Sequence, residues 1–286
     1  MSLRYSYYPG CSLHSTSREY DLSARAVCAA FGVELEELKD WVCCGATSAH
    51  ALEPDVAHAL GVHNLVLAEA QGLDVVTPCA ACFNRLKTSE YEAKEGLRPA
   101  SVPTRQSPYS GKVTARHLLD VFARDVGVER IRQAVKQPLA GLKPVSYYGC
   151  LLVRPQNVMK LDDPEDPALL DEMLRAVGAA PVEWSYKTEC CGASMSVPFP
   201  SAVETIVGQL AGMAREAGAN CFVTACPLCQ LNLDTRQTGP EPPLPAFFFT
   251  ELLGLALALP GANGWFAKHL VSPAPVLQSL SAAART

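Results

Sequence analysis

The chain has 286 residues, 49% of them hydrophobic, which is enough for one large domain or two ordinary ones. Its formal net charge of −5 argues against a nucleic-acid-binding protein, because such proteins are usually basic. Its most apolar stretch, Phe247 to Pro260, contains Glu251 and is shorter than the roughly 20 residues that span a bilayer. Since no secretory signal opens the chain, we expect a cytoplasmic protein without a membrane span.

The first half of the chain alternates strand and helix patterns. The segment 97–111 contains three prolines and is interpreted as a loop inserted in this half. Pro54 suits the first turn of a helix. In chain order, the predicted elements are a strand at Arg4–Tyr8, a helix at Arg18–Phe31, a strand at Val33–Leu38, a helix at Pro54–Gln71 and a strand at Leu73–Thr77.

The second half repeats this alternation and ends in an apolar helix after the proline-rich run Gly239–Pro245. Strands that alternate with helices predict parallel sheets and an α/β fold. We therefore expect two domains, residues 1–140 and 141–286, each a small parallel sheet with flanking helices. The elements predicted here are a strand at Pro144–Tyr148, a helix at Pro167–Val177, a strand at Pro181–Tyr186, a helix at Pro200–Ala217 and a strand at Asn220–Thr224.

Cysteines carry an internal repeat. Ten of the twelve recur in the same order and at similar spacing in both halves, as a lone cysteine, a Cys-Cys-Gly and a CxxC. Cys28 and Cys221 lie outside the repeat and are interpreted as small buried hydrophobic residues. The two sets are Cys11, Cys43, Cys44, Cys79 and Cys82 in the first half, and Cys150, Cys190, Cys191, Cys226 and Cys229 in the second.

So many thiols in a reducing cytosol indicate metal binding rather than disulfides. Each repeated cysteine follows a predicted strand, so the five thiols of a set are expected to meet at the carboxyl edge of one sheet. A zinc site or a cubane cluster takes four ligands. Five thiols that include an adjacent pair favour a larger, irregular cluster.

In order and spacing, these motifs resemble the two CCG domains of the B-type subunit of heterodisulfide reductase. The resemblance covers nearly the whole chain and includes the segments 43–48 and 249–255. It implies that each five-cysteine set holds a non-cubane [4Fe-4S] cluster, with all ten repeated cysteines as ligands. It also implies a disulfide substrate between the two clusters, each of which takes one sulfur while an electron is delivered. No Rossmann glycine fingerprint is present, so neither NAD nor flavin is expected on this chain.

The resemblance further implies two partner proteins, an FAD-containing A-type subunit and a C-type subunit with ordinary [4Fe-4S] clusters. In methanogens the family reduces the mixed disulfide of coenzymes M and B. Related bacterial assemblies are thought to act on protein-bound sulfur, including carriers with lipoate or cysteine. The sequence leaves open the physiological disulfide, the direction of electron flow, the stoichiometry of the complex and the cysteine that bridges two irons.

Two other functions stay open. One is the CCG subunit of a lactate- or glycolate-oxidising complex. The other is an electron-transfer subunit in which one half binds zinc. The metal content of the protein discriminates the zinc hypothesis directly.

Polar residues near the cysteine motifs give weaker signals. His14 and His50 are candidate proton donors to a departing thiolate, although a hydrogen-bonding role near the surface is the simpler interpretation. Arg85, Arg154 and Lys187 flank the motifs and are candidates for contact with an anionic group of the substrate or for offsetting the charge of a cluster, although a surface role is the simpler interpretation.

Overall fold

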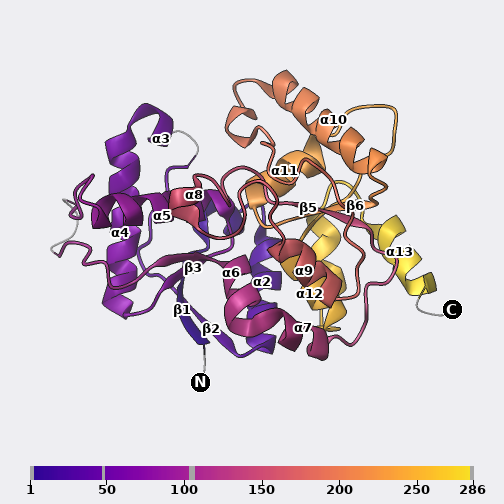
Figure 1. The fold of residues 1–286 in the computed structure, drawn as a ribbon, viewed down its shortest axis with the longest axis horizontal. Coiled ribbons are helices and arrows are strands. Elements are labelled where there is room, and N and C mark those ends of the chain that lie inside the picture. Colours follow the sequence, from indigo (N-terminus) through magenta and orange to yellow (C-terminus); the bar gives the residue numbers. More distant parts are fainter. Residues whose placement is uncertain (1–2, 47–48, 103–106, 284–286) are drawn as a thin grey trace.

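The computed structural model describes residues 3–46, 49–102 and 107–283, which form two parallel β-sheets flanked by helices (Figure 1). The predicted α/β class is confirmed. Strands of the first half make up one sheet, and strands of the second half make up the other. In the part of the chain that the structure describes, no helix has both the length and the apolar character needed to cross a membrane.

The first sheet has four parallel strands in the order β2-β1-β3-β4. Both its faces are covered, which explains why β3 is buried at every position. The long helix predicted from Pro54 to Gln71 is present with these bounds and ends at Gly72 in the left-handed conformation. The elements are β1 (Leu3–Tyr7), α1 (Gly10–Leu13), α2 (Arg18–Ala30), β2 (Val33–Glu37), α3 (Ala49–Leu52), α4 (Pro54–Gln71), β3 (Val75–Thr77), α5 (Ala80–Lys94), β4 (Ala115–His117), α6 (Leu118–Asp120), the π-helical η1 (Val121–Gly127) and α7 (Val128–Ala134).

The inserted loop predicted at 97–111 is only partly within the described residues, since 103–106 lie outside them. Its described parts, 97–102 and 107–111, contain neither helix nor strand. The strand β4 that follows is absent from the sequence prediction, because three residues are too few to show an alternating pattern.

The second sheet has three parallel strands in the order β5-β6-β7. The strand β7 is equally short and is also absent from the sequence prediction. The elements are β5 (Pro144–Tyr147), α8 (Gln156–Met159), α9 (Leu169–Ala176), the 3-10 helix η2 (Ala193–Met195), α10 (Pro200–Glu216), β6 (Cys221–Thr224), α11 (Pro227–Thr235), β7 (Ala246–Phe248), α12 (Phe249–Ala256), the 3-10 helix η3 (Ala262–Lys268) and α13 (Ala274–Ala283).

The strand predicted at Pro181–Tyr186 is wrong. This segment runs beside β5 and donates one backbone hydrogen bond to it, from the N–H of Val182 to the carbonyl of Pro144, at 2.8 Å. Two residues further along β5, the carbonyl of Ser146 accepts from the indole nitrogen of Trp184 at 3.0 Å. Because a side chain occupies this acceptor, the ladder of backbone bonds is not continued, and the segment stays irregular.

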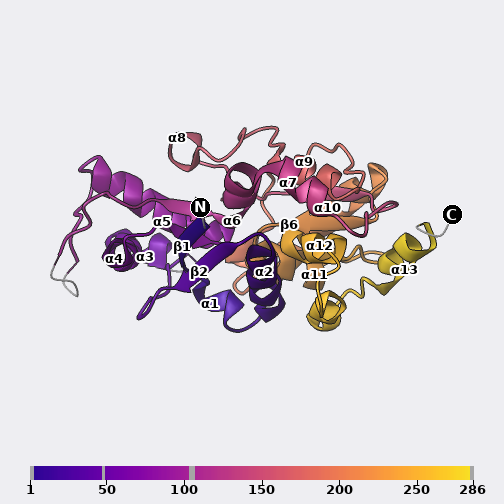
Figure 2. The same cartoon turned by 90° about the horizontal axis from the view of Figure 1, so that it is seen from below.

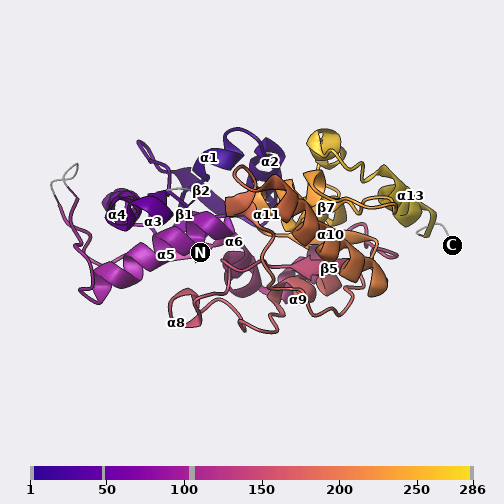
Figure 3. The ribbon, with the colours of Figure 1, turned by 90° about the horizontal axis from the view of Figure 1, so that it is seen from above.

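The two halves share their hydrophobic core. Helix α2 of the first half packs on α12 of the second, and the Tyr20 ring stacks on Phe248 with centroids 3.9 Å apart. The hydroxyl groups of Ser23 and Thr250 are 2.6 Å apart in the same contact. Figure 2 shows α2 beside α12, and Figure 3 shows it beside the yellow segment η3. A second helix contact between the halves joins α7 of the first to α9 of the second. Two pairs of helices therefore hold the halves together.

Candidate iron–sulfur site

The first five-thiol set lies at the carboxyl edge of the first sheet. Cys11 is in the short helix that follows β1, and Cys43 and Cys44 follow β2. Cys79 is the residue before α5, and Cys82 is in its first turn, directly after β3. The Sγ atoms of Cys44 and Cys82 are 3.4 Å apart, although 38 residues separate them. Three loops thus bring these thiols together, as parallel strands that end at one edge require.

The second set has the same arrangement. Cys150 follows β5, and Cys190 and Cys191 follow the irregular segment that replaces the predicted strand. Cys226 precedes α11, and Cys229 lies in its first turn after β6. The Sγ atoms of Cys191 and Cys229 are 3.6 Å apart. The repeat in the sequence is therefore a repeat in space.

Two equivalent glycines bring the backbone close to the thiols. Gly10 and Gly149 have φ angles of +73° and +65°, in the left-handed region that favours glycine. A Cβ atom at Gly10 would lie 2.9 Å from Sγ of Cys82, and one at Gly149 would lie 3.0 Å from Sγ of Cys229. A side chain at either position would therefore intrude on the thiol set.

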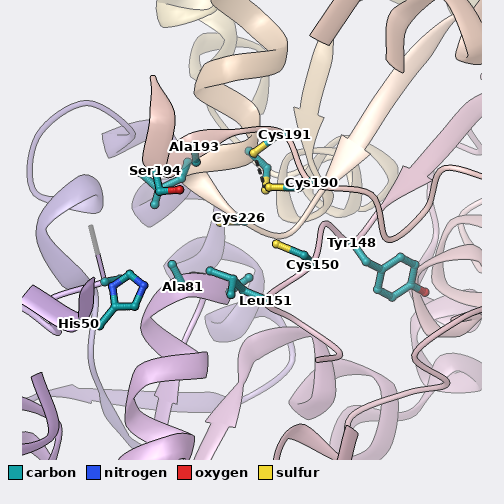
Figure 4. Close-up of a pocket in the computed structure, with 14 residues that line it drawn as sticks. His50, Ala81, Tyr148, Cys150, Leu151, Cys190, Cys191, Ala193, Ser194 and Cys226 are labelled. Carbon is teal, nitrogen blue, oxygen red and sulfur yellow. Dashed lines mark hydrogen bonds between the residues drawn. The ribbon is translucent and has the colours of Figure 1, made fainter. Parts of the chain in front are cut away.

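A cavity of about 120 Å³ lies between the two halves, and all five cysteines of the second set line it. Figure 4 shows Cys150, Cys190 and Cys191 on one side, with His50 and Ala81 of the first half opposite. The thiol of Cys79 also interacts with that of Cys226, so the two sets meet at their CxxC motifs. The CxxC cysteines are buried, whereas Cys11, Cys43 and Cys190 are exposed.

Hydrogen bonds between the thiols shift their pKa values in opposite directions. A hydrogen bond from Cys11 lowers the pKa of Cys43, and the same pairing raises the pKa of Cys11. In the second set, a hydrogen bond from Cys150 lowers the pKa of Cys190 to about 6. In each set, one cysteine thus has its pKa lowered by a neighbouring thiol, which favours the thiolate, the form that binds metal.

This donor set fits an iron–sulfur group. Thiolates are the usual ligands of such groups, and each set provides five thiols from three loops, with backbone approach allowed by a glycine. In residues 3–46, 49–102 and 107–283, no group of three or more His, Cys, Asp or Glu side chains is arranged to hold a single metal ion.

The structure separates the two candidate proton donors. His14 is about half exposed, bonds Oε1 of Glu37 at 3.0 Å, and makes an edge contact with Trp41. His50 lines the cavity, and its buried Nδ1 has no hydrogen-bond partner among the described residues. Of the two, His50 is therefore the one placed to act on a molecule in the cavity.

The three flanking cations also differ. Arg154 pairs with Glu165, and Lys187 pairs with Asp166 at 2.8 Å. Arg85 donates a hydrogen bond to its neighbour Asn84. Burial lowers the pKa of Arg85, and this effect outweighs the charge of Cys44, which raises it. Arg154 and Lys187 thus already form ion pairs with carboxylates.

Two buried side chains near the thiols carry no functional signal in the sequence prediction. The amide of Asn84 donates to the carbonyls of Leu151 at 3.0 Å and Arg154 at 2.8 Å, and so ties α5 to the loop after Cys150. His117 at the end of β4 hydrogen-bonds the carbonyl of Ala225, beside Cys226. A polar residue at a strand end is the signal that could have indicated His117, but the strand itself is too short to predict.

The chain is similar in sequence to proteins of known families. The family described as "CCG: Cysteine-rich domain" matches residues 5–87 and 145–234. A protein of Wolinella succinogenes named "8-methylmenaquinol:fumarate reductase membrane anchor subunit" is 30% identical over 91% of this chain and 94% of its own length. The B-type subunit of a "Ferredoxin/F(420)H(2)-dependent CoB-CoM heterodisulfide reductase" of Methanosarcina acetivorans is 28% identical over 88% of each chain. A protein of Archaeoglobus profundus, named as similar to the B-type subunit of heterodisulfide reductase, is 28% identical over 82% of each.

Among solved structures, a hypothetical protein from Helicobacter pylori has a similar fold, with a TM-score of 0.70 and 9% identity. The match covers 94% of this chain and 52% of that one, so the present chain spans about half its length. The two family matches contain all ten repeated cysteines. The chain therefore belongs to the CCG cysteine-rich domain family and, within it, to the iron–sulfur proteins that resemble the B-type subunit of heterodisulfide reductase.

Proposed function

We propose that this chain is the subunit of a heterodisulfide reductase-like complex that cleaves or forms a disulfide-type S–S bond. The observation that carries the proposal is the pair of complete five-thiol sets that meet through Cys79 and Cys226, next to a cavity that the cysteines of the second set line. Bound iron–sulfur groups would supply electrons one at a time, and splitting a disulfide takes two. We further propose that both groups are of the non-cubane [4Fe-4S] type and that all ten repeated cysteines are ligands.

The residues of the cavity suit a sulfur substrate. Ala81, Leu151 and Leu228 give it apolar walls, which favour an uncharged disulfide over water. His50 lines the same space with its side chain. In the proposed reaction, the imidazole of His50 delivers a proton to the departing thiolate, or removes one when the bond forms.

The remaining parts of the proposal rest on the resemblance of this chain to the B-type subunits of heterodisulfide reductase. The partners are an FAD-containing protein of the A type and a [4Fe-4S] protein of the C type, and the assembly works in the cytoplasm. The substrate is a small disulfide or a protein-bound sulfur on lipoate or cysteine. The two functional halves correspond to residues 1–140 and 141–286. Relatives named as subunits of reductases support a function inside a complex.

Metal analysis of anaerobically purified protein tests the proposal first. Two four-iron clusters require about eight irons and no zinc per chain. Cys226→Ser is expected to lose about half of the iron. Cys221→Ser is the matched control, because Cys221 is equally buried and lies outside both sets. About four irons with one zinc would leave a single redox site and end the two-cluster proposal.

Disulfide chemistry is tested with reduced viologen as the electron donor and a panel of oxidised small thiols and oxidised lipoamide. The wild type should oxidise the dye in the presence of at least one disulfide. His50→Gln should lower kcat more at high pH than at low pH, where solvent supplies protons more readily. A fully loaded protein that reduces none of these disulfides, alone or with its partners, would contradict the proposal.

A second candidate function is electron transfer within a quinol-linked reductase. It is favoured by the relative named as the membrane anchor subunit of a quinol:fumarate reductase, which is 30% identical over 91% of this chain. In that case the loaded protein should copurify with a flavin-containing reductase and be oxidised by it, while disulfides leave it reduced. Copurification with a hydroxyacid oxidase would instead support the lactate or glycolate alternative.

A further inference from the structure

The side chain of His117 connects the two CxxC turns. It lies at the end of β4, is fully buried, and has its Nε2 atom 3.1 Å from the carbonyl oxygen of Ala225. This carbonyl belongs to the other half of the chain and directly precedes Cys226. In the first sheet, His117 pairs with Thr77, two residues before Cys79, and its ring also faces the carbonyl of Pro78. The imidazole thus lies between the residues that precede the first cysteine of each CxxC.

Hydrogen bonds determine where the single ring proton lies. The backbone N–H of Leu119 donates to Nδ1 of His117 at 3.0 Å, so Nδ1 carries a lone pair. Nε2 therefore carries the proton and donates it to the carbonyl of Ala225. The ring is also held by an edge contact with Phe83 in α5, at 5.8 Å between centroids. The hydrogen bonds with Leu119 and Ala225 fix the tautomer, and the contact with Phe83 helps to fix the orientation of the ring.

This connection lies where the two thiol sets meet. Cys79 and Cys226 interact directly, and each is the residue before the helix that contains the second cysteine of its motif. A change in the distance between the two turns therefore moves both sets relative to one another. The backbone N–H of Ala81 in the first CxxC also bonds the thiol of Cys226, whereas the bond of His117 is made to the backbone of the second turn, at the carbonyl of Ala225.

We propose that His117 is a positioning residue that sets the separation of the two iron–sulfur groups by holding the CxxC turns of both halves together. This inference rests on the iron–sulfur binding of the proposed function, but not on its disulfide chemistry. Its consequence is a fixed magnetic interaction between the two groups, since dipolar coupling depends steeply on their distance.

Two substitutions separate the two hydrogen bonds of the ring. In His117→Asn, the side-chain oxygen lies where Nδ1 was and still accepts from Leu119, as asparagine commonly does at a helix start. The asparagine is too short to reach Ala225, so the connection between the halves is lost. In His117→Gln, the longer amide reaches this carbonyl and keeps the connection. His58→Gln is a control for replacing a buried histidine, because His58 bonds Glu92 and the carbonyl of Pro99, away from the CxxC turns.

The measurement is electron paramagnetic resonance of the dithionite-reduced full-length protein, at equal iron content per chain. His117→Asn should lose the well-defined interaction between the two paramagnetic groups and show a broad range of weaker ones. His117→Gln and His58→Gln should keep the wild-type interaction. Wild-type coupling in His117→Asn would overturn the inference, as would an equal loss in His117→Gln.

The design remains decisive if His117→Asn fails to hold both groups. In that case His117→Gln alone decides, since wild-type coupling supports the inference and altered coupling at full iron content overturns it. A failure of the proposed function gives a different result. If the wild type contains one iron–sulfur group, the coupling is absent before any substitution is made.

Discussion

Substitution of Gly10 by alanine tests whether close backbone approach is required at the first thiol set. The new Cβ atom would lie 2.9 Å from Sγ of Cys82, which is closer than such atoms approach in folded proteins. The φ angle of +73° adds about 1–2 kcal/mol of strain for a residue with a side chain. We therefore expect a moderate loss of stability together with loss of the iron bound by the first set.

Gly72→Ala separates these two effects. Gly72 has nearly the same φ angle, +71°, but a Cβ atom there meets no other described atom within 4 Å. Gly72→Ala should lose about 1–2 kcal/mol of unfolding free energy in urea titrations, and Gly10→Ala should lose at least as much, because its Cβ atom also contacts Cys82. Only Gly10→Ala should fall from about eight irons per chain to about four. If Gly10→Ala retains as much iron as Gly72→Ala, the glycine is a backbone requirement alone and the reasoning is refuted.

Three further predictions concern stability. Burial alone raises the pKa of Glu90, but the charge of Lys87 and other partners outweigh it, so the pKa of Glu90 lies below its usual value. The contribution of the Glu90 carboxylate to the free energy of unfolding is therefore complete above about pH 4.5 and is lost as the pH falls below that. In urea titrations, Glu90→Gln should lose less of its unfolding free energy in acid than the wild type does. His269→Ala leaves the carboxylate of Glu251 buried without its partner and should cost about 3–5 kcal/mol, measured by urea unfolding. Trp184→Phe removes the indole bond to β5 and should cost about 1 kcal/mol, while an unchanged midpoint would contradict our account of the irregular segment.

Local patterns are sufficient to predict most elements and the grouping of the thiols. The helix from Pro54 to Gln71 has the predicted bounds, because proline at its start and glycine after its end mark both. Cysteines that follow successive parallel strands must lie at one edge of the sheet, so their convergence in each half follows from topology. The relation between the two sets does not follow from it, since the contact between Cys79 and Cys226 depends on how the halves pack.

The parts of the structure that the sequence analysis predicted wrongly or missed depend on contacts between residues far apart in the chain. Pro181–Tyr186 has the composition of a strand, but the indole of Trp184 takes an acceptor of β5. The sequence gives no reason to prefer His14 or His50, whereas in the structure His14 bonds Glu37 and His50 lines the cavity. His117 is not identified from the sequence, because β4 is too short to predict and its partner Ala225 is 108 residues away.

The helix contacts between the halves lead to a last prediction, which concerns a chain divided between residues 140 and 141. Helix α2 has the stacked pair Tyr20–Phe248 and the Ser23–Thr250 hydrogen bond on its face toward α12, and all four of these side chains are fully buried. A fragment 1–140 would expose this face to water, and exposure of large apolar groups costs about 1.5–3 kcal/mol each. Because small domains have only about 5–15 kcal/mol of stability, we expect this fragment to be unfolded and free of iron when it is expressed alone. Coexpressed fragments 1–140 and 141–286 should associate, which affinity purification through a tag on one fragment would measure, and recover about eight irons per pair. A fragment 1–140 that unfolds cooperatively and binds about four irons by itself would mean that the helix contacts between the halves orient them but are not required for either half to fold.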